Sequence, residues 1–300
     1  MKKISNFLIA IACAFILFDF LIGLMTSVFI SKSGFRFARL YSGTQINADI
    51  VVVGNSRAVN SFNVPEISKR MRKYWYNLGY NGMGPRMVEA VLLDYLDLNK
   101  KPDLVIFEVS NLWQDINPIR DLRVFAKYSS RLRELDMCND GFNAGLAACS
   151  HAFSCNGEML FRIINYVDRD DQNWVNSGRM NAEYAHIAIE AASRSVKKNV
   201  SSNNIEAYHR IFCELQKRGV RYCCVIGPYL IDDTAHSRLI EAVNTCVSKS
   251  NVIDHAMLIK DCNLYADPLH LNKKGSLEYA KLLCRELGDL DVCNLHNSID

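Results

Sequence analysis

The residues of this sequence best suited to chemistry are a serine, a histidine and an aspartate that lie far apart in the chain. Ser56 follows Gly54 and Asn55 directly after an apolar run, and Asp267 and His270 form an Asp-x-x-His pair near the other end. A serine hydroxyl becomes a nucleophile when a histidine accepts its proton and a carboxylate orients that histidine. These residue types therefore predict nucleophilic chemistry, provided that folding brings them together.

The segment before Ser56 is typical of a buried strand that ends in a tight turn. Residues 49–53 read Asp-Ile-Val-Val-Val, and Gly-Asn-Ser follows. Open α/β sheets build their sites at the carboxyl ends of strands. The same tripeptide also fits a strand exit without a chemical role, because Gly, Asn and Ser are common turn formers. The Asp-x-x-His pair favours the catalytic interpretation.

Strands and helices alternate along most of the chain. Apolar runs predict further strands at 74–77, 104–109, 221–226 and 252–253, and apolar positions at helical spacing predict helices between them and at about 274–287. This order predicts a five-stranded parallel sheet with right-handed crossovers and helices on both faces. The strand ends would then share one rim, where Ser56, Gly82, Asn111 and His270 fall.

The polar stretch from about residue 116 to residue 203 interrupts this alternation. It is rich in Asp, Asn and Arg and has one clear helical stretch around 180–197. It is too long for an ordinary loop, so it is predicted to be a helical insertion. The expected organisation is therefore an anchor and connector at 1–48, followed by one α/β domain at 49–300 that carries the insertion.

The N-terminal segment is apolar over Phe7–Ile30, with one charge at Asp19, and it follows Lys2 and Lys3. It is long enough to cross a bilayer, and it lacks the small-x-small cleavage site of a signal peptide, so a retained signal anchor is expected. Lys32, Arg36 and Arg39 weaken the charge difference across the span. We nevertheless expect a cytoplasmic N-terminus and an exported domain.

Asp19 near the middle of this span has two interpretations. A charge at that depth costs about 2.5 to 3.5 kcal/mol, which the apolar neighbours can offset. The carboxylate then either faces a polar group of a membrane partner or is a tolerated charge.

Composition excludes some functions. The formal charge of +3 is spread over scattered Lys and Arg residues, so no nucleic-acid partner is expected. The eleven cysteines have no spacing that indicates disulfides, and pairing stays open. Cys138, Cys149 and Cys155 lie near His151 but include no Cys-x-x-Cys pair, so we expect no metal site.

Taken together, residues 49–115 and 204–288 resemble the SGNH, or GDSL-type, hydrolase superfamily, whose fold is a flavodoxin-like three-layer α/β/α sandwich. The resemblance implies that Ser56 is the nucleophile and that Asp267 and His270 complete the triad. It also implies an oxyanion hole formed by the backbone N–H groups of Ser56 and Gly82 and by the side chain of Asn111. The chain departs from the family in having Gly-Asn-Ser for Gly-Asp-Ser, and Glu-Val-Ser-Asn at 108–111 for Gly-x-Asn-Asp.

Membrane-anchored members of this superfamily often modify cell-surface polysaccharides. The resemblance therefore implies a serine esterase or O-acyltransferase that acts on acyl, chiefly acetyl, esters without a cofactor, in the periplasm and anchored to a bacterial-type inner membrane. A membrane acyl-donor protein is a further implied partner. The alternative is an inactive protein of the same fold that binds or assembles polysaccharide.

Two further residues are candidates for substrate contact. Trp113 is able to stack on a sugar ring, although a Trp after a buried strand also suits a core position. Arg57 is expected at the pocket rim, or else as a surface cation next to the turn.

Overall fold

The computed structural model describes residues 2–155, 157–248 and 252–289. Its contacts divide the chain into two compact units, the first made of Met1–Thr44 with Asn117–Asp171 and the second of Gln45–Ile116 with Gln172–Asp300. This division differs from the expected one, because residues 117–171 group with the N-terminal segment and 172–203 group with the sheet. A buried ion pair between Arg36 and Asp171, with 2.7 Å from Nε to Oδ2, explains part of this grouping.

The second unit contains a five-stranded sheet in the order β2-β1-β3-β4-β5, in which every neighbouring pair is parallel. The strands are β1 (Ile50–Val53), β2 (Trp75–Asn77), β3 (Leu104–Glu108), β4 (Arg221–Ile226) and β5 (Val252–Asp254). The first three strands are buried throughout, as expected for apolar runs covered on both faces. The structure thus confirms the α/β class and the five-stranded parallel sheet.

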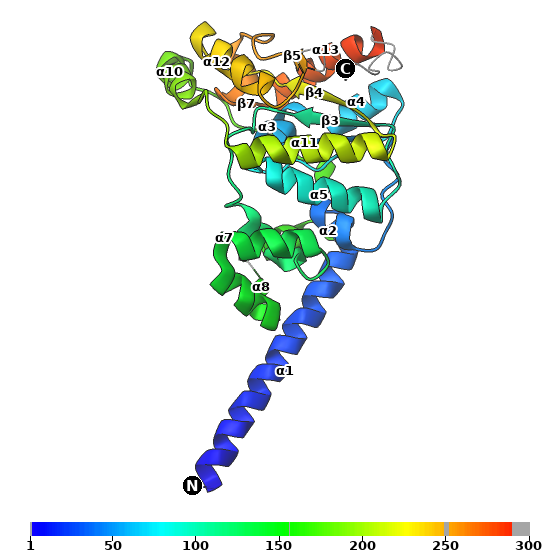
Figure 1. The fold of residues 1–300 in the computed structure, drawn as a ribbon, viewed down its shortest axis with the longest axis vertical. Helices are drawn as coiled ribbons and strands as arrows, with labels where there is room; N and C mark the ends of the chain where they lie inside the picture. Colours follow the sequence, from blue (N-terminus) through cyan, green and yellow to red (C-terminus); the bar gives the residue numbers. More distant parts are fainter. Residues whose placement is uncertain (1, 156, 249–251, 290–300) are drawn as a thin grey trace. The chain divides into compact units, whose positions relative to one another are not determined.

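Helices of the second unit pack on the sheet through alternate strand residues. They are α3 (Ser56–Ser61), α4 (Val64–Met71), α5 (Pro85–Leu98), α10 (Ala185–Ser195), α11 (Ser202–Lys217), α12 (Asp233–Asn244) and α13 (Lys273–Asp289), with 3-10 turns η2 (Asp171–Asn173), η3 (Ala182–Tyr184) and η5 (Cys262–Leu264). Ile50, Val52 and Ile106 share one core cluster with residues of α4 and α13. Phe107 points the other way and packs against Tyr208 and Phe212 of α11, which lies beside α5 (Figure 1). A short antiparallel pair, β6 (Tyr265–Asp267) and β7 (His270–Leu271), precedes α13.

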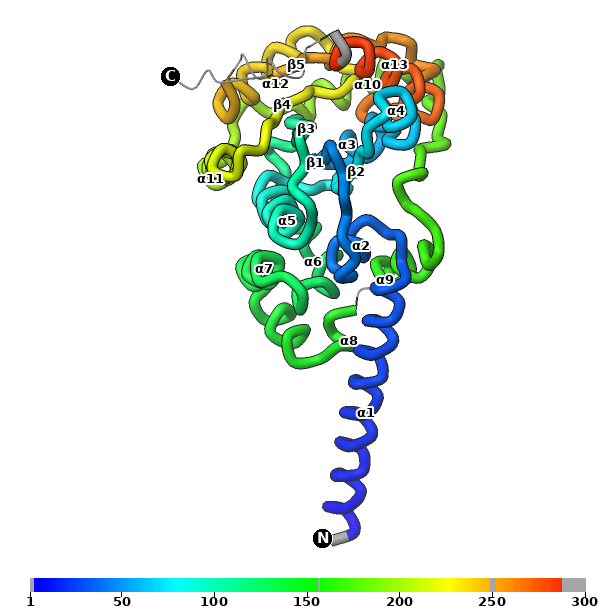
Figure 2. Tube along the Cα trace, turned by 90° about the vertical axis from the view of Figure 1, so that its right-hand side faces the viewer, coloured from blue at the N-terminus to red at the C-terminus, as the bar shows by residue number. Residues whose placement is uncertain are grey.

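The first unit is helical. It contains α1 (Lys2–Lys32), α2 (Arg36–Tyr41), α6 (Ile119–Leu122), η1 (Arg123–Phe125), α7 (Ser130–Cys149), α8 (His151–Ser154) and α9 (Gly157–Asn165). Figure 2 follows α1 as a single long helix. By length and composition α1 is able to cross a membrane, a test that a signal sequence also passes. From Ile4 to Phe18 its side chains are exposed, whereas Gly23, Thr26 and Ile30 are buried.

Asp19 is bound within its own chain. Its carboxylate accepts hydrogen bonds from the hydroxyl of Ser150 and from the backbone N–H groups of His151 (3.1 Å) and Ala152 (2.9 Å), which begin α8. N–H groups in the first turn of a helix have no partner within that helix, so a carboxylate is a suitable acceptor. Asp19 therefore has a local structural partner, which neither interpretation from the sequence included.

Gly23, one turn further along α1, allows this contact. A Cβ atom built at Gly23 would lie 2.4 Å from Cδ2 of His151, so the imidazole packs directly on the helix backbone. Thr26 continues the same face and places Oγ1 3.5 Å from Sγ of Cys155. One face of α1 thus docks residues 150–155.

We expect Gly23→Ala to destabilise the first unit by about 1–3 kcal/mol, because the added methyl group must displace the His151 ring. Gly145→Ala is the matched control, since a Cβ at Gly145 of α7 meets no atom within 4 Å and alanine favours helix by up to about 1 kcal/mol. Thermal unfolding of the full chain in detergent measures both, and peptide-resolved thiol labelling at Cys155 reports undocking. Equal melting temperatures and labelling rates in the two variants would show that Gly23 is not a docking position.

Candidate active site

The turn between β1 and α3 places Ser56 at the carboxyl end of the first strand. Gly54 has φ +148°, and a Cβ there would lie 2.8 Å from Cβ of Glu108, so only glycine fits. Asn55 is the N-cap of α3, since its Oδ1 accepts the N–H of Arg57 at 2.8 Å. Ser56 is therefore the first residue of the helix, and it is partly exposed.

The structure brings Ser56, His270 and Asp267 into one hydrogen-bonded chain. The Oγ of Ser56 lies 2.7 Å from Nε2 of His270, and Nδ1 of His270 lies 2.9 Å from each carboxylate oxygen of Asp267. Asp267 and His270 are paired across the short β6–β7 ladder, which sets their separation. With Nδ1 donating to Asp267, Nε2 is the acceptor for the serine proton, as nucleophilic activation requires.

The environment keeps Asp267 ionised. Partial burial raises its pKa, but hydrogen bonds from His270 and from the backbone N–H groups of Leu269 and His270 outweigh burial and hold the pKa below the ordinary value of 3.8. The Asp267 side chain is 48% exposed and that of His270 is 21% exposed. The carboxylate is thus negative at neutral pH, and the imidazole beside it is reachable from solvent.

Asn272 holds the segment that carries His270. Its Nδ2 donates to the carbonyls of Asn263 (2.9 Å) and Tyr265 (3.1 Å), and its Oδ1 accepts the N–H groups of Lys274 and Gly275 at the start of α13. Asn272 was not among the site residues expected from the sequence. The sequence feature that could have identified it is an asparagine directly before a helix, which is typical of an N-cap.

Gly82 lies in a loop that is hydrogen-bonded to the turn before Ser56. The N–H of Tyr80 donates to the carbonyl of Gly54 at 3.1 Å, and Gly82 adopts φ +71°. Gly79 already donates its N–H to Oδ1 of Asn77 at 2.8 Å. No hydrogen bond within residues 2–155, 157–248 and 252–289 uses the N–H of Gly82 or of Ser56. Within the described residues, these two N–H groups therefore have no acceptor of their own.

Asn111 is fully buried and hydrogen-bonded to the same loop. Its Nδ2 donates to the carbonyl of Met83 at 2.9 Å, and its Oδ1 accepts the hydroxyl of Tyr208 at 2.5 Å. Asn111 thus positions the residue next to Gly82. Its side chain has no exposed surface for a substrate oxygen to reach, so its expected direct contact with the oxyanion is wrong. The sequence did not indicate Tyr208, which comes from α11 and whose pKa burial raises well above its usual value.

Arg57 does not lie at a rim, so its expected location is wrong. The side chain is 4% exposed, its Nη2 donates to the carbonyl of Ser110 at 3.1 Å, and its guanidinium lies 3.8 Å from the ring centroid of Tyr229. Nε lies 3.7 Å from the buried carboxylate of Glu108, which also accepts the hydroxyl of Ser110. Arg57 thus links α3 to the ends of β3 and β4 because a buried cation needs an anion and acceptors. Trp113 is partly exposed in the turn after β3.

Among known proteins, no family model matches the sequence, and no curated protein is significantly similar to it.

Proposed function

We propose that the protein is a membrane-anchored serine esterase or O-acyltransferase of the SGNH type, built on a flavodoxin-like three-layer fold. The observation that carries the proposal is the hydrogen-bonded chain from Ser56 Oγ through His270 to Asp267, at 2.7 and 2.9 Å. The strand order 2-1-3-4-5 agrees with a flavodoxin-like topology.

The reaction begins when Ser56 Oγ attacks the carbonyl carbon of an acyl ester while Nε2 of His270 takes its proton. Asp267 stabilises the resulting imidazolium. The carbonyl oxygen becomes an oxyanion that the N–H groups of Ser56 and Gly82 bind, while Asn111 holds the Gly82 loop in place through the carbonyl of Met83. As the C–O bond to the sugar breaks, His270 returns the proton to the leaving oxygen and the acyl group stays on Ser56.

The second half of the reaction removes the acyl group from Ser56. His270 takes a proton from water, which gives free acid, or from a sugar hydroxyl, which gives a new ester. His270 then returns the proton to Ser56. The partly exposed His270 and Asp267 agree with either acceptor.

The proposed substrate is an acetylated cell-surface polysaccharide. Anchoring by α1, with the second unit on the periplasmic side of a bacterial-type inner membrane, would keep the enzyme beside such polymers and beside a membrane protein that supplies acyl groups. The length and apolar character of α1 support the anchor.

A fluorophosphonate probe tests the enzyme proposal directly. We expect it to label the full chain in detergent, with the modification mapped by mass spectrometry to Ser56, and we expect cleavage of p-nitrophenyl acetate at a rate that heat denaturation removes. Absence of both labelling and cleavage would favour the inactive polysaccharide-binding alternative.

Addition of an acceptor separates transfer from hydrolysis. If a sugar hydroxyl takes the acyl group from Ser56, an added oligosaccharide should gain an acetyl group, which mass spectrometry detects as a mass increase. The release of free acetate should then fall. Unchanged acetate release with no acetylated sugar, across oligosaccharides of several compositions, would assign the enzyme to hydrolysis.

A further inference from the structure

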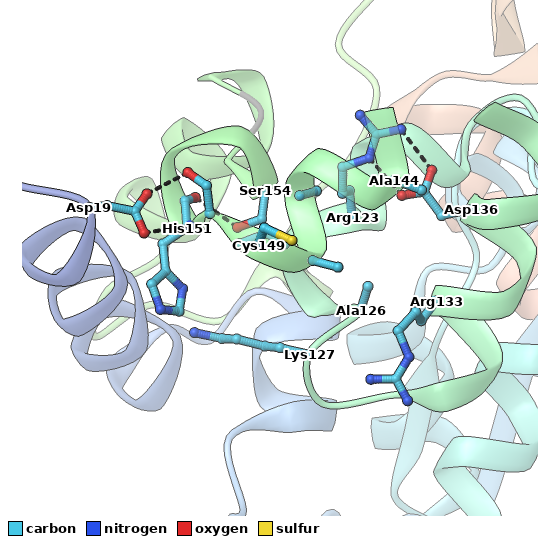
Figure 3. A pocket seen from close by; sticks show the side chains of 14 residues that line it. Asp19, Arg123, Ala126, Lys127, Arg133, Asp136, Ala144, Cys149, His151 and Ser154 are labelled. Carbon is cyan, nitrogen blue, oxygen red and sulfur yellow. Dashed lines mark hydrogen bonds and ion pairs between the residues drawn. The ribbon is translucent and has the colours of Figure 1, made fainter. Parts of the chain in front are cut away.

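The first unit contains a cavity of ≈ 240 Å³ between α1, η1, α7 and α8 (Figure 3). Small side chains of α7 leave the space, and charged side chains surround it. The lining includes Asp19, Arg123, Lys127, Arg133, Asp136 and His151.

The charges around this cavity do not cancel. Arg123 is neutralised by Asp136, with 2.6 Å from Nε to Oδ2 and 2.8 Å from Nη2 to Oδ1. Asp19 accepts hydrogen bonds from Ser150 and the start of α8. Lys127 and Arg133 form no ion pair within the described part of the chain. Lys127 donates to the hydroxyl of Ser27 at 3.1 Å, and its Nζ lies 4.9 Å from the ring centroid of Tyr128. Figure 3 shows Lys127 and Arg133 on either side of Ala126. The cavity therefore has two cations available for an anion.

Apolar side chains are exposed around the same unit. Phe142 of α7, Phe153 of α8 and Phe161 of α9 are 77%, 52% and 69% exposed. Exposed phenylalanine side chains of this kind suit contact with lipid acyl chains.

The position of the cavity along α1 indicates its depth. A hydrocarbon core needs about 20 helical residues, so a span that begins at Ile4, after Lys2 and Lys3, ends near Gly23. The side chains of α1 are exposed up to Phe18, and protein covers one face from Asp19 onward. Asp19 and His151 line the cavity, and Asp19 lies four residues, about 6 Å, before Gly23. The cavity therefore lies within about one helical turn of the point where the hydrocarbon ends.

We propose that this cavity binds the phosphate of an anionic membrane lipid through Lys127 and Arg133. The proposal rests on α1 being a membrane helix, which is part of the proposed function, but it requires no catalytic step. An ammonium and a guanidinium donate hydrogen bonds that phosphate oxygens accept, and phospholipid headgroups place phosphate at this depth. Two unpaired cations favour a lipid with a net negative charge over one whose phosphate is neutralised by its own ammonium group.

Native mass spectrometry of the full chain in a neutral detergent tests the proposal. We expect the wild type to retain dioleoylphosphatidylglycerol about tenfold better than dioleoylphosphatidylcholine, and Lys127→Gln/Arg133→Gln to lose this preference. Lys217→Gln/Lys260→Gln, which removes two exposed cations of the second unit, is the matched control and should keep it. A melting temperature of the cavity variant within the range of the control shows that it is folded.

Three outcomes would overturn the proposal. These are equal retention of the two lipids by the wild type, an unchanged preference in the cavity variant, and loss of the preference when millimolar inorganic phosphate is added, which would make free phosphate the ligand. Extraction of the chain from membranes by alkaline carbonate would refute the anchor instead, and absence of fluorophosphonate labelling would refute the enzyme. The three failures are therefore distinguishable.

Discussion

Ser56→Ala is expected to lower the rate of acetyl-ester cleavage by about a millionfold and to abolish fluorophosphonate labelling. The Oγ of Ser56 is the atom that His270 Nε2 contacts at 2.7 Å, and alanine leaves no atom there to form the acyl bond. The fold should be unaffected, because Ser56 is partly exposed and the N-cap of α3 is supplied by Asn55. Initial rates and labelling of matched amounts of the two proteins give the comparison.

The double variant Ser56→Ala/His270→Ala tests whether the two residues act together. If Ser56 and His270 act as one unit, the double variant will be about as slow as either single variant. Ser237→Ala is a matched control, since this exposed serine of α12 only donates to the carbonyl of Asp233. Losses that multiply in the double variant would show that the two residues act separately, and the proposed proton transfer would then be wrong.

Elements with a continuous local pattern could be predicted from the sequence. The strand expected at 221–226 is Arg221–Ile226, and that expected at 104–109 ends one residue earlier, at Glu108. Buried parallel strands are short apolar runs bounded by polar residues, so few alternative positions exist. The order of strands in the sheet has no such local signal and was implied only by the resemblance.

The partner of Asp19 and the grouping of residues 117–171 depend on contacts between distant segments. Asp19 binds residues 150–152, and Arg36 pairs with Asp171, although nothing near Asp19 or Arg36 in the sequence indicates these partners. A polar stretch after a strand looks the same whether it covers the sheet or packs on another helix. This is why the expected insertion at 116–203 was divided differently by the structure.

The candidate site shows the same limit at the level of single side chains. The resemblance pointed to Asn111, but the two groups that hold it, the Met83 carbonyl and the Tyr208 hydroxyl, come from a loop and from α11. Arg57 follows a turn, where cations are commonly exposed, yet Glu108, Ser110 and Tyr229 enclose it. Sequence patterns locate residues, whereas tertiary packing decides which of their atoms remain available for a substrate.

Asp267→Asn is expected to lower the rate at neutral pH by about a hundred- to ten-thousandfold. An asparagine amide can donate through Nδ2 to Nδ1 of His270, which moves the imidazole proton to Nε2 and removes the acceptor for Ser56. It also removes the charge that stabilises the imidazolium. We expect less than the full effect seen for a buried carboxylate, because Asp267 is 48% exposed and water can replace part of its interaction.

The pH dependence gives this last prediction a second test. Hydrogen bonds hold the pKa of Asp267 below 3.8 despite the opposing effect of partial burial, so the wild-type carboxylate stays ionised from pH 5 to pH 8. The contribution of the ionised carboxylate to the rate is therefore complete at pH values above its pKa, and it is lost only as the pH falls through that lowered pKa. The deficit of Asp267→Asn should therefore persist at both pH 5 and pH 8, whereas Asp233→Asn, an exposed carboxylate of α12, should match the wild type. A deficit below tenfold at both pH values would show that Asp267 does not orient the imidazole, and that His270 would have to be held by its backbone segment and Asn272 alone.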